Sequence, residues 1–396
     1  MSRRTLWLAD HELVDRIGHH LFYNCSLAAG AKAEGMKAIV LCQKKYLFDP
    51  LDGTEMEEFF RRDWRARPPG WTVRSRRALD FLERMARRRF LSDLGRGLPP
   101  ARLQERDVIF AQMLAPRHLA GWLHWLAGIP VDRAPALAVH LGYDPYRFAG
   151  DAGISGGFQR LEKAGLAAKV HLISDSEPLA AQYENFLQRK VKVLPHVVPP
   201  GIAARKKRDL ESPVTFCYLG NPRREKGFVE IATAVEQLSG GGMRFVLQVV
   251  SPDAPCASSV ERLKKAALPN VELIEGLLTR DDYLARLEAA DVMFVPYHLD
   301  KHGDRTSGIF CEALVAGKPV ITTENSWMSL ETAASGVGWL VPERNAPALA
   351  AVITKAARDY PSVAEKSLRL APRYEQEFSG RNFVKNLVQI ADHASG

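Results

Sequence analysis

Residues Asp291–Val320, DVMFVPYHLDKHGDRTSGIFCEALVAGKPV, decide the fold that this sequence predicts. The stretch opens with four apolar residues, Val292–Val295, and such a run is typical of a strand buried on both faces of a parallel sheet. After a polar segment, Ile309–Ala316 has the pattern of a helix that ends at Gly317, with a proline two residues later. Strand, loop and helix in this order form the repeating unit of an α/β protein.

The start of this predicted helix suits an anion, because small and polar residues, Asp304 to Gly308, come just before it. Backbone N–H groups at a helix N-terminus have no partner within the helix, and the helix dipole attracts negative charge. Gly308 also lacks the side chain that would block a phosphate. By itself the stretch fits an ordinary scaffold unit equally well, since only some strand-loop-helix units bind ligands.

Apolar strand candidates alternate with helical stretches along the whole chain, which predicts two parallel, doubly wound sheets. The candidates before residue 198 are Thr5–Ala9, Lys37–Cys42, Asp107–Phe110, Ala136–Val139, Lys169–Ile173 and Lys192–Leu194. Those after it are Val214–Leu219, Arg244–Val250, Val271–Ile274, Val292–Val295, Pro319–Thr322 and Gly338–Val341.

Proline and charge interrupt this alternation between Leu194 and Arg208, so we place a domain boundary after Val198. The expected first domain is 1–198, the second is 199–375, and 376–396 is a C-terminal helix that packs back toward the first domain. Two such domains form a cleft between the carboxyl ends of their strands, where open α/β sheets bind ligands.

The composition suits a globular protein with two or three cores: 396 residues, 46% hydrophobic and 25% charged. Five scattered cysteines without a CxxC pair indicate reduced thiols and a cytoplasmic location. The N-terminus lacks an apolar leader, and the longest charge-poor stretch, Leu119–Val131, is shorter than the roughly 20 residues of a bilayer span. We therefore expect a protein that is neither exported nor transmembrane.

The positive charge is concentrated in an arginine-rich excursion, residues 61–106, which holds fourteen arginines, no lysine and five acidic residues. Within it, 76–90 has the pattern of an amphipathic helix with arginines along one face. Three interpretations stay open: a surface helix docked on its own domain, a contact with an anionic membrane surface, or a nucleic-acid contact. No RNA-binding motif with interleaved aromatic residues supports the last, so we expect no nucleic-acid partner.

A second motif, FCYLGNPRREKG at Phe216–Gly227, places a glycine turn and basic residues between a predicted strand and a helical run, Phe228–Leu238. The spacing brings Arg223, Arg224 and Lys226 to where their charges can neutralise a diphosphate. The motif is neither a Walker loop nor a dinucleotide fingerprint. Solvated basic residues in a surface loop are the alternative interpretation.

Together the two motifs resemble those of GT-B glycosyltransferases, most closely the retaining family called family 4 or group 1. The family's glycine-basic-KG signature corresponds to Gly220…Lys226-Gly227, and its E-x7-E signature with EAxAxGKPVI corresponds to Asp304…Glu312–Ile321. Val170–Ala180 and Val193–Val198 are similar to further family segments, so the likeness covers nearly the whole chain except the excursion and the last residues. It implies two Rossmann-like domains that face each other across a cleft, the first on the acceptor side and the second binding the nucleotide sugar.

The resemblance also implies a role for each matching residue. Glu312 would bind the ribose and Asp304 the donor sugar, while Lys226 would neutralise the phosphates as the leaving group departs, so neither a metal nor another cofactor is expected. His140 would face the transferred sugar and is expected, with Lys226 and Asp304, to be catalytic. The expected donor-binding residues are Gly18, Arg223, Arg224, Lys226, Arg305, Ser307, Gly308, Ile309 and Glu312.

Three positions depart from the family pattern. Asp304 stands in place of a glutamate and has a shorter reach, and His196 replaces the hinge asparagine. Asn221 takes the place of an arginine, so Arg223 or Arg224 must substitute for it, or Arg305 must reach the diphosphate. Plain structural roles remain open for His140, as a satisfied histidine, and for Asp304, as an acid at a helix start.

The resemblance implies a metal-independent hexosyltransferase that moves a sugar from a UDP- or GDP-sugar to a hydroxyl of a glycan or lipid-linked acceptor. We expect retention, a role in bacterial surface polysaccharide or lipopolysaccharide synthesis, and a cytoplasmic or peripheral location at the inner membrane face. One alternative is an inverting enzyme with a first-domain base, His140, His19 or Asp10. The other, suggested by Asp304 and Asn221, is a protein that binds a nucleotide sugar without turnover.

Overall fold

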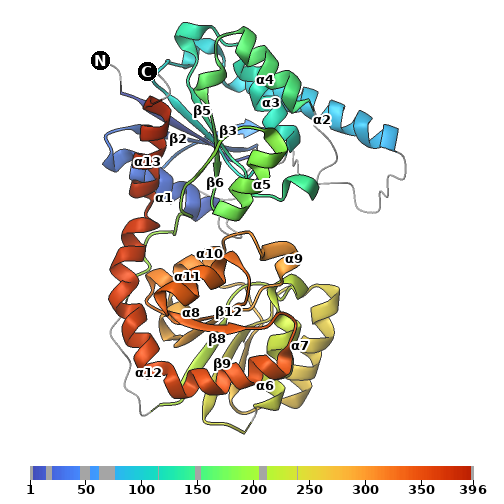
Figure 1. Cartoon of the computed structure of the whole chain (residues 1–396), viewed down its shortest axis with the longest axis vertical. Helices are drawn as coiled ribbons and strands as arrows, with labels where there is room; N and C mark the ends of the chain where they lie inside the picture. Colours follow the sequence, from blue (N-terminus) through green and yellow to red (C-terminus); the bar gives the residue numbers. More distant parts are fainter. Residues whose placement is uncertain are drawn as a thin grey trace. The chain divides into compact units, whose positions relative to one another are not determined.

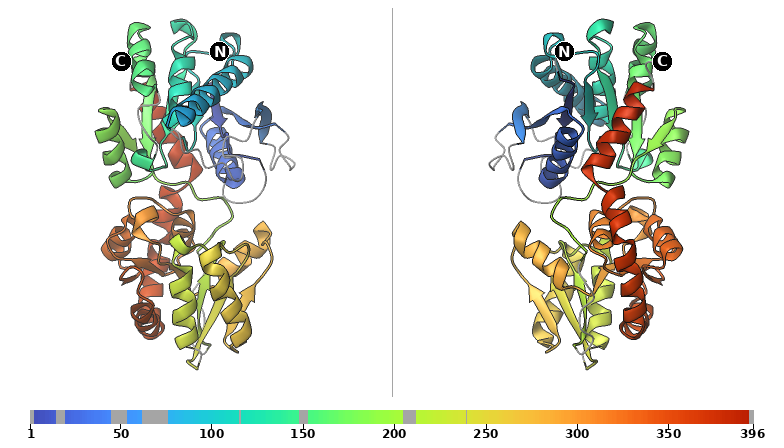
Figure 2. Two further views of the ribbon diagram at one scale, coloured as in Figure 1. Left: turned by 90° about the vertical axis from the view of Figure 1, so that its right-hand side faces the viewer. Right: turned by 90° about the vertical axis from the view of Figure 1, so that its left-hand side faces the viewer.

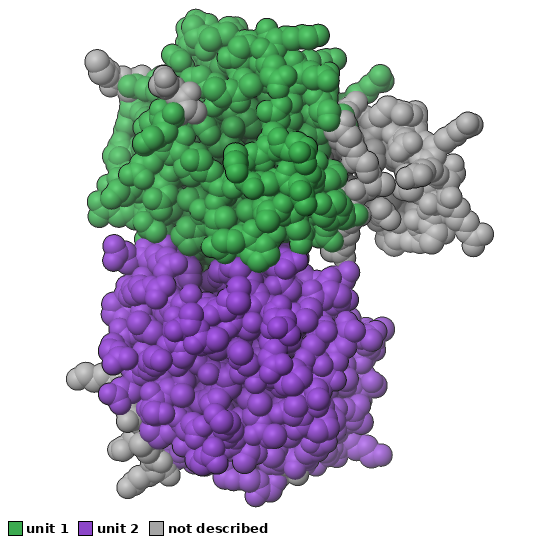
Figure 3. Space-filling model, viewed as in Figure 1, with its two compact units in different colours: residues 1–199, 379–396 green, residues 200–378 purple. Residues whose placement is uncertain are grey.

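A computed structural model describes residues 3–14, 20–44, 54–61, 76–114, 116–147, 153–204, 212–238 and 240–393 of the chain. These residues fold into two compact units, which are coloured separately in Figure 3. The first unit comprises Met1–Pro199 and Ser379–Gly396, and the second comprises Pro200–Phe378. Each unit is built on one parallel β-sheet, which confirms the predicted α/β, doubly wound fold class.

The first unit has a seven-stranded sheet in the order β3-β2-β1-β4-β5-β6-β7 (Figure 1). Alternate side chains of the central strands enter two different cores, because successive residues of a strand point to opposite faces. Leu6 and Leu8 pack with α1 and α13, whereas Trp7 and Ala9 face the core that holds α2, α3 and α4. The strands are β1 (Thr5–Ala9), β2 (Lys37–Gln43), β3 (Glu55–Phe60), β4 (Val108–Ala111), β5 (Ala136–His140), β6 (Val170–Ser174) and β7 (Val191–Val193). The helices are α1 (His20–Ala33), α2 (Arg76–Gly97), α3 (Pro116–Leu126), α4 (Ile154–Lys163), α5 (Glu177–Leu187) and α13 (Gly380–Asp392).

The second unit has a six-stranded sheet in the order β10-β9-β8-β11-β12-β13. One face of the sheet packs on α6, α7 and α12 through aromatic residues such as Phe216, Phe245 and Phe294. The strands are β8 (Val214–Tyr218), β9 (Met243–Gln248), β10 (Val271–Ile274), β11 (Val292–Val295), β12 (Val320–Thr323) and β13 (Gly338–Val341). The helices are α6 (Phe228–Gln237), α7 (Ala254–Ala266), α8 (Arg280–Ala289), α9 (Leu299–His302), α10 (Gly308–Val315), α11 (Trp327–Ser335) and α12 (Ala346–Glu377).

Strand β3, which the sequence pattern did not predict, pairs with β2 at the edge of the first sheet. Its sequence, EMEEFF, contains three glutamates and so lacks the apolar run that marked the other strands. An edge strand tolerates such residues because part of its surface meets water. Only Phe59 and Phe60 at its end are buried, and they join the core of the unit.

The arginine-rich excursion joins the first core through the second half of α2. Phe90, Leu94 and Leu98 are buried there, and the Phe90 ring meets the edge of Trp122 in α3. Residues 62–75 and the side chains of 76–84, 86 and 87 lie outside the described part of the chain. Contact of 76–90 with an anionic membrane surface therefore stays a prediction. In the described part of the chain, every helix is too short or too polar to cross a bilayer.

Helix α13 belongs to the first unit, although α12 directly before it belongs to the second. It packs on α1 (Figures 1 and 2). Two glycines lie at this contact, and a Cβ on Gly380 would lie only 2.1 Å from the carbonyl oxygen of Ser26. The ion pair between Arg381 and Glu34 adds to this contact. Because α12 continues to Glu377, the boundary expected after residue 375 falls inside a helix.

Candidate functional site

In the second unit, the loop after β8 meets the start of α10 at the carboxyl ends of the strands. Gly220 has a φ of 120°, and its N–H donates a 2.7 Å hydrogen bond to Oε1 of Gln248 at the end of β9. A Cβ on Gly220 would lie 3.4 Å from Cδ1 of Ile309 and 3.6 Å from Nζ of Lys226. The structure therefore brings together three predicted elements: the glycine turn, the lysine and the helix start.

Lys226 is held in place by the glycine that follows it. Gly227 has a φ of 71°, and a Cβ there would lie 2.2 Å from the carbonyl oxygen of Pro296, so only glycine fits between this turn and the end of β11. The ammonium of Lys226 lies 5.8 Å from the ring centroid of Tyr297. Among the described residues, no carboxylate lies within ion-pair distance of the Lys226 ammonium.

The first turn of α10 offers backbone donors beside this lysine. The Oγ atom of Ser307 accepts the N–H of Phe310 at 3.4 Å and so caps the helix. The amides of Gly308 and Ile309 belong to the same turn, where N–H groups lack a helical partner. With the dipole of an eight-residue helix behind them, these amides are suited to an anionic group.

His302, which the sequence did not single out, lies in the same positively charged surroundings. Its ring centroid is 4.8 Å from that of Tyr297. Burial, together with the positive charges of Arg305 and Lys226, lowers the pKa of His302 to about 3. The imidazole is therefore neutral near pH 7, and Arg305 and Lys226 make its surroundings positively charged.

Glu312 lies one turn into α10 and is 8% exposed. Its carboxylate accepts a hydrogen bond from the hydroxyl of Tyr283 in α8. Burial raises the pKa of Glu312, while the bond from Tyr283 and the charge of Arg280 oppose that rise. Tyr283 was missed because one tyrosine in a helix carries no sequence signal of its partner.

The other residues predicted in this unit lie around the same edge of the sheet. Asp304 is exposed in the turn after α9, and Arg305 follows it. Arg223 and Arg224 precede Lys226, and the backbone N–H of Arg224 donates to Oδ2 of Asp253 at 2.9 Å. The structure thus places these residues on one loop cluster with Gly220, Lys226 and Ile309.

In the first unit, a buried ion pair lies where β1 ends. Asp10 has two occupied oxygens: Oδ1 accepts the N–H of Glu12 at 3.0 Å, and Oδ2 accepts from Asn24 at 2.8 Å and from Nδ1 of His20 at 2.9 Å. The other ring nitrogen of His20 lies 3.4 Å from Glu12. Burial alone would lower the pKa of His20, but Asp10 and Glu12 raise it to about 10. Burial alone would raise the pKa of Asp10, but His20 holds that pKa well below its usual range.

His140 ends β5 and lies at the same edge of the first sheet. Its Nε2 atom is 3.9 Å from Oδ2 of Asp175, and Nδ1 of His196 is 4.0 Å from the same oxygen. Burial lowers the pKa of His196 to about 4, although the charge of Asp175 opposes this. Gly18 and His19, also considered from the sequence, lie outside the described residues.

One cluster in the described part of the chain has side chains suited to a metal: His298, Asp300 and Glu343. The guanidinium of Arg344 lies among them, 3.3 Å from Nδ1 of His298 and 3.5 Å from both Asp300 and Glu343. The positively charged side chain of Arg344 therefore already forms ion pairs with both acids.

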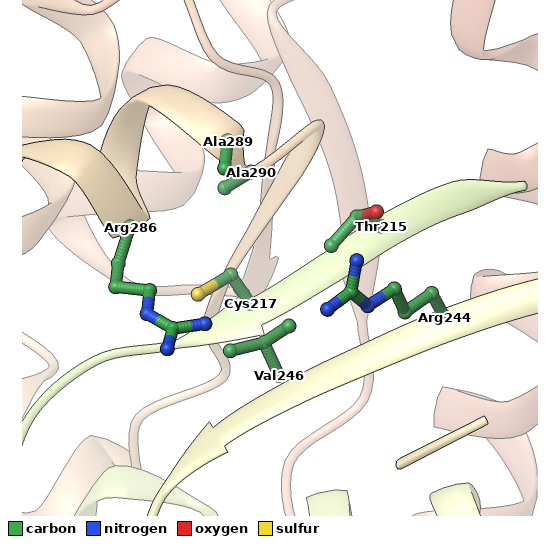
Figure 4. Close-up of a pocket in the computed structure, with 7 residues that line it drawn as sticks. All are labelled: Thr215, Cys217, Arg244, Val246, Arg286, Ala289 and Ala290. Atoms are coloured by element: carbon green, nitrogen blue, oxygen red, sulfur yellow. The ribbon is translucent and has the colours of Figure 1, made fainter. Parts of the chain in front are cut away.

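A hollow of about 280 Å³ lies between the sheet of the second unit and α8 (Figure 4). It follows the first halves of β8 and β9, toward the amino ends of the strands, and is therefore separate from the Lys226 cluster. Two arginines at the hollow form ion pairs with one carboxylate, that of Glu272. The lining residues are Thr215, Cys217, Arg244, Val246, Arg286, Ala289 and Ala290.

Part of the second unit is similar to a known protein family. Residues 213–359 match the family model of glycosyl transferases group 1. A putative colanic acid biosynthesis glycosyltransferase, WcaL of Salmonella typhimurium, is 26% identical over 183 residues, which are 45% of each chain. The chain thus spans about half or less of the length of such curated relatives.

Solved structures match over the whole chain. Sucrose-phosphate synthase of Thermosynechococcus elongatus covers 99% of both chains with a TM-score of 0.65 and 16% identity. Anabaena HepE, solved in complex with UDP, covers 98% of this chain and 100% of its own with a TM-score of 0.65 and 16% identity. At this level of identity the likeness shows a shared fold.

Proposed function

We propose that this chain, whose residues 213–359 match the family model of glycosyl transferases group 1 and whose fold is GT-B, transfers a hexose from a nucleotide diphosphate sugar to a hydroxyl of a glycan or lipid-linked acceptor. One observation carries the proposal: Gly220, Lys226 and Ile309 converge at the carboxyl edge of the second sheet. A lysine, a glycine turn and the start of a helix together suit a diphosphate. The UDP complex of HepE supports a nucleotide donor.

In the proposed reaction, the bond between the anomeric carbon and the diphosphate breaks, the acceptor oxygen forms the new glycosidic bond, and the proton of the acceptor hydroxyl passes to the departing diphosphate. Negative charge then develops on the leaving diphosphate. Lys226, Arg305 and the amides of Gly308 and Ile309 would stabilise that charge, with Arg223 and Arg224 nearby. Donors aimed at a developing charge each contribute about 10²–10³-fold to rate. This arrangement supports a reaction without a metal, because the side chains supply the positive charge.

For the rest of the donor, we propose that Glu312 binds the ribose and Asp304 the sugar hydroxyls. Asp304 is exposed and so accessible to a sugar. The roles that the resemblance implies for His140 and Gly18 stay predictions. WcaL acts in colanic acid biosynthesis by its description, and we propose a similar role in surface polysaccharide or lipopolysaccharide synthesis at the inner face of the membrane.

Retention is the proposed stereochemical outcome. The alternative, inversion, needs a base, and the candidates for it lie in the first unit. Asp10 is a poor candidate for the base of an inverting enzyme, since both its oxygens accept hydrogen bonds and His20 lowers its pKa. His140 beside Asp175 remains the candidate base for inversion, because a nearby carboxylate can stabilise an imidazolium. An anomer-resolved spectrum of the product separates the two outcomes.

The proposal is tested with a panel of UDP-, GDP- and ADP-sugars. A ligand that binds the folded state raises its melting temperature, so at least one donor, expected to be a UDP- or GDP-sugar, should shift the transition upward. Slow release of free sugar without an acceptor should accompany that shift. No shift with any donor would refute the function, and a shift without sugar release or transfer would favour a binding protein without turnover.

A further inference from the structure

We propose that Tyr283 is a positioning residue for the ribose: its hydroxyl fixes one oxygen of Glu312, so that the other oxygen meets the ribose hydroxyls of the nucleotide. This inference rests on the proposed function and deepens it, because it adds a residue that the group 1 motifs do not include. The hydrogen bond from Tyr283 to Oε2 of Glu312 is its starting point.

Tyr283 is fixed from its own helix. Thr279 caps α8, where its Oγ1 atom accepts the N–H of Asp282 at 3.2 Å and its carbonyl oxygen accepts the N–H of Tyr283 at 2.9 Å. The guanidinium of Arg280 lies 5.7 Å from the centre of the Tyr283 ring and also donates to the carbonyl oxygen of Pro200 at 3.0 Å. The phenol is thus held between a capped helix and a cation before any ligand binds.

Glu312 needs such a partner because it is buried. Burial raises the pKa of Glu312 and so favours its protonated form. A protonated carboxyl group accepts fewer hydrogen bonds than a carboxylate. The Tyr283 hydroxyl and the charge of Arg280 both favour the ionised form. A carboxylate offers about four acceptor sites on two oxygens. With one taken by Tyr283, the remaining sites are suited to the two adjacent ribose hydroxyls, which are donors.

The position of the pair agrees with this role. Glu312 lies in α10, the helix whose first-turn amides meet the proposed diphosphate. In a helix, residues three and four positions apart lie on the same face, which puts Glu312 behind Gly308 and Ile309. Tyr283 comes from the neighbouring helix α8, after the loop that follows β10. The pair therefore stands where the nucleoside joins a diphosphate held at the start of α10.

The test measures the Kd of UDP by calorimetry between pH 5.5 and 8.5 for wild type and Tyr283→Phe. Loss of one net hydrogen bond weakens binding by about two- to tenfold. The loss should grow as the pH falls, because the pKa of Glu312 rises once Tyr283 no longer favours its charged form. Discrimination between UDP and 2′,3′-dideoxy-UDP should also shrink, which a purely structural role would not change.

Tyr360→Phe is the matched control. Its hydroxyl donates to the buried Asp291 at 2.9 Å, in the same unit but at the amino end of β11. Tyr360→Phe should lower the free energy of unfolding and leave the Kd of UDP and its pH dependence unchanged. If Tyr283→Phe does not fold, Glu312→Gln replaces it: an amide does not titrate, so this variant should bind UDP more weakly and keep only the pH dependence that comes from the terminal phosphate of UDP.

Two negative outcomes are distinguishable. If wild type binds UDP and Tyr283→Phe shows the same Kd, pH profile and discrimination, the inference is wrong and the proposed function stands. If wild type binds none of UDP, GDP and ADP, the proposed function fails and the positioning role fails with it.

Discussion

Ionised side chains at the carboxyl edges of the two sheets differ in how they are partnered. At the first sheet, a buried acid is matched to a cation: His20 lies 2.9 Å from Asp10 and 3.4 Å from Glu12. At the second sheet, Lys226 faces an aromatic ring, and within the described residues no carboxylate pairs with it. The charge of Asp10 is thus balanced inside the protein, whereas the charge of Lys226 is suited to an anionic ligand.

Burial explains how each arrangement is stable. Asp10 is fully buried, and a buried charge without a partner costs several kcal/mol, so it must be paired and hydrogen-bonded. Lys226 is only partly buried and keeps some contact with water, so its charge can stay unpaired at low cost. Excess positive charge is therefore tolerated in the second unit, where it can neutralise a diphosphate.

The largest expected effect tests the unpaired lysine. Lys226→Ala should lower kcat/KM for sugar transfer by about 10²–10³-fold, since it removes a cation aimed at the leaving diphosphate. Initial-rate kinetics with the donor found in the panel measure this loss. Lys355→Ala is the control, because Lys355 is exposed and forms an ordinary ion pair with Asp359. Equal activity in both variants would remove Lys226 from the mechanism and end the contrast between the two edges.

A pair of glycines, one in each unit, gives the next effect. Gly227 and Gly35 have nearly equal φ angles, 71° and 76°, so alanine is similarly strained at both. A Cβ would collide with the carbonyl oxygen of Pro296 at Gly227, whereas nothing lies within 4 Å at Gly35. Gly227→Ala should reduce the free energy of unfolding by about 2–3 kcal/mol and Gly35→Ala by about 1 kcal/mol.

Urea unfolding measures both variants, and the affinity for the donor adds a second measurement. Only Gly227→Ala should weaken donor binding, because Lys226 must move with the displaced turn. If both variants lose the same stability and bind the donor equally well, contact with Pro296 does not fix the position of Lys226.

The fold and the phosphate-facing cluster could be predicted from the sequence because they depend on local patterns. Apolar runs marked twelve of the thirteen strands in the described part of the chain, and the acid-rich β3 was missed because an edge strand does not need such a run. Gly220, Lys226 and Ile309 were found because each lies beside a strand end or a helix start.

Residues whose role depends on a distant partner could not be predicted in the same way. Tyr283 and Glu312 are 29 positions apart, and the sequence gives no sign that their side chains meet. The sequence suggested Asp10, but it could not show that His20 neutralises this carboxylate. Such pairs are set by tertiary packing rather than by periodicity or local spacing.

The smallest expected effect concerns the buried pair of the first unit. In the unfolded chain His20 titrates near its ordinary value of 6.5, and in the folded chain its pKa is about 10, so the folded state holds the proton more tightly. The stability from this pair is fully present below pH 6.5 and is lost as the pH rises toward 10. Between pH 7 and 9 we expect wild type to lose about 2 kcal/mol more than His20→Gln, as measured by urea unfolding. His393→Gln, at an exposed histidine of the same unit, should keep the wild-type slope. If His20→Gln keeps that slope as well, His20 is neutral in the folded protein, and the first edge is not the matched set of charges that separates it from the second.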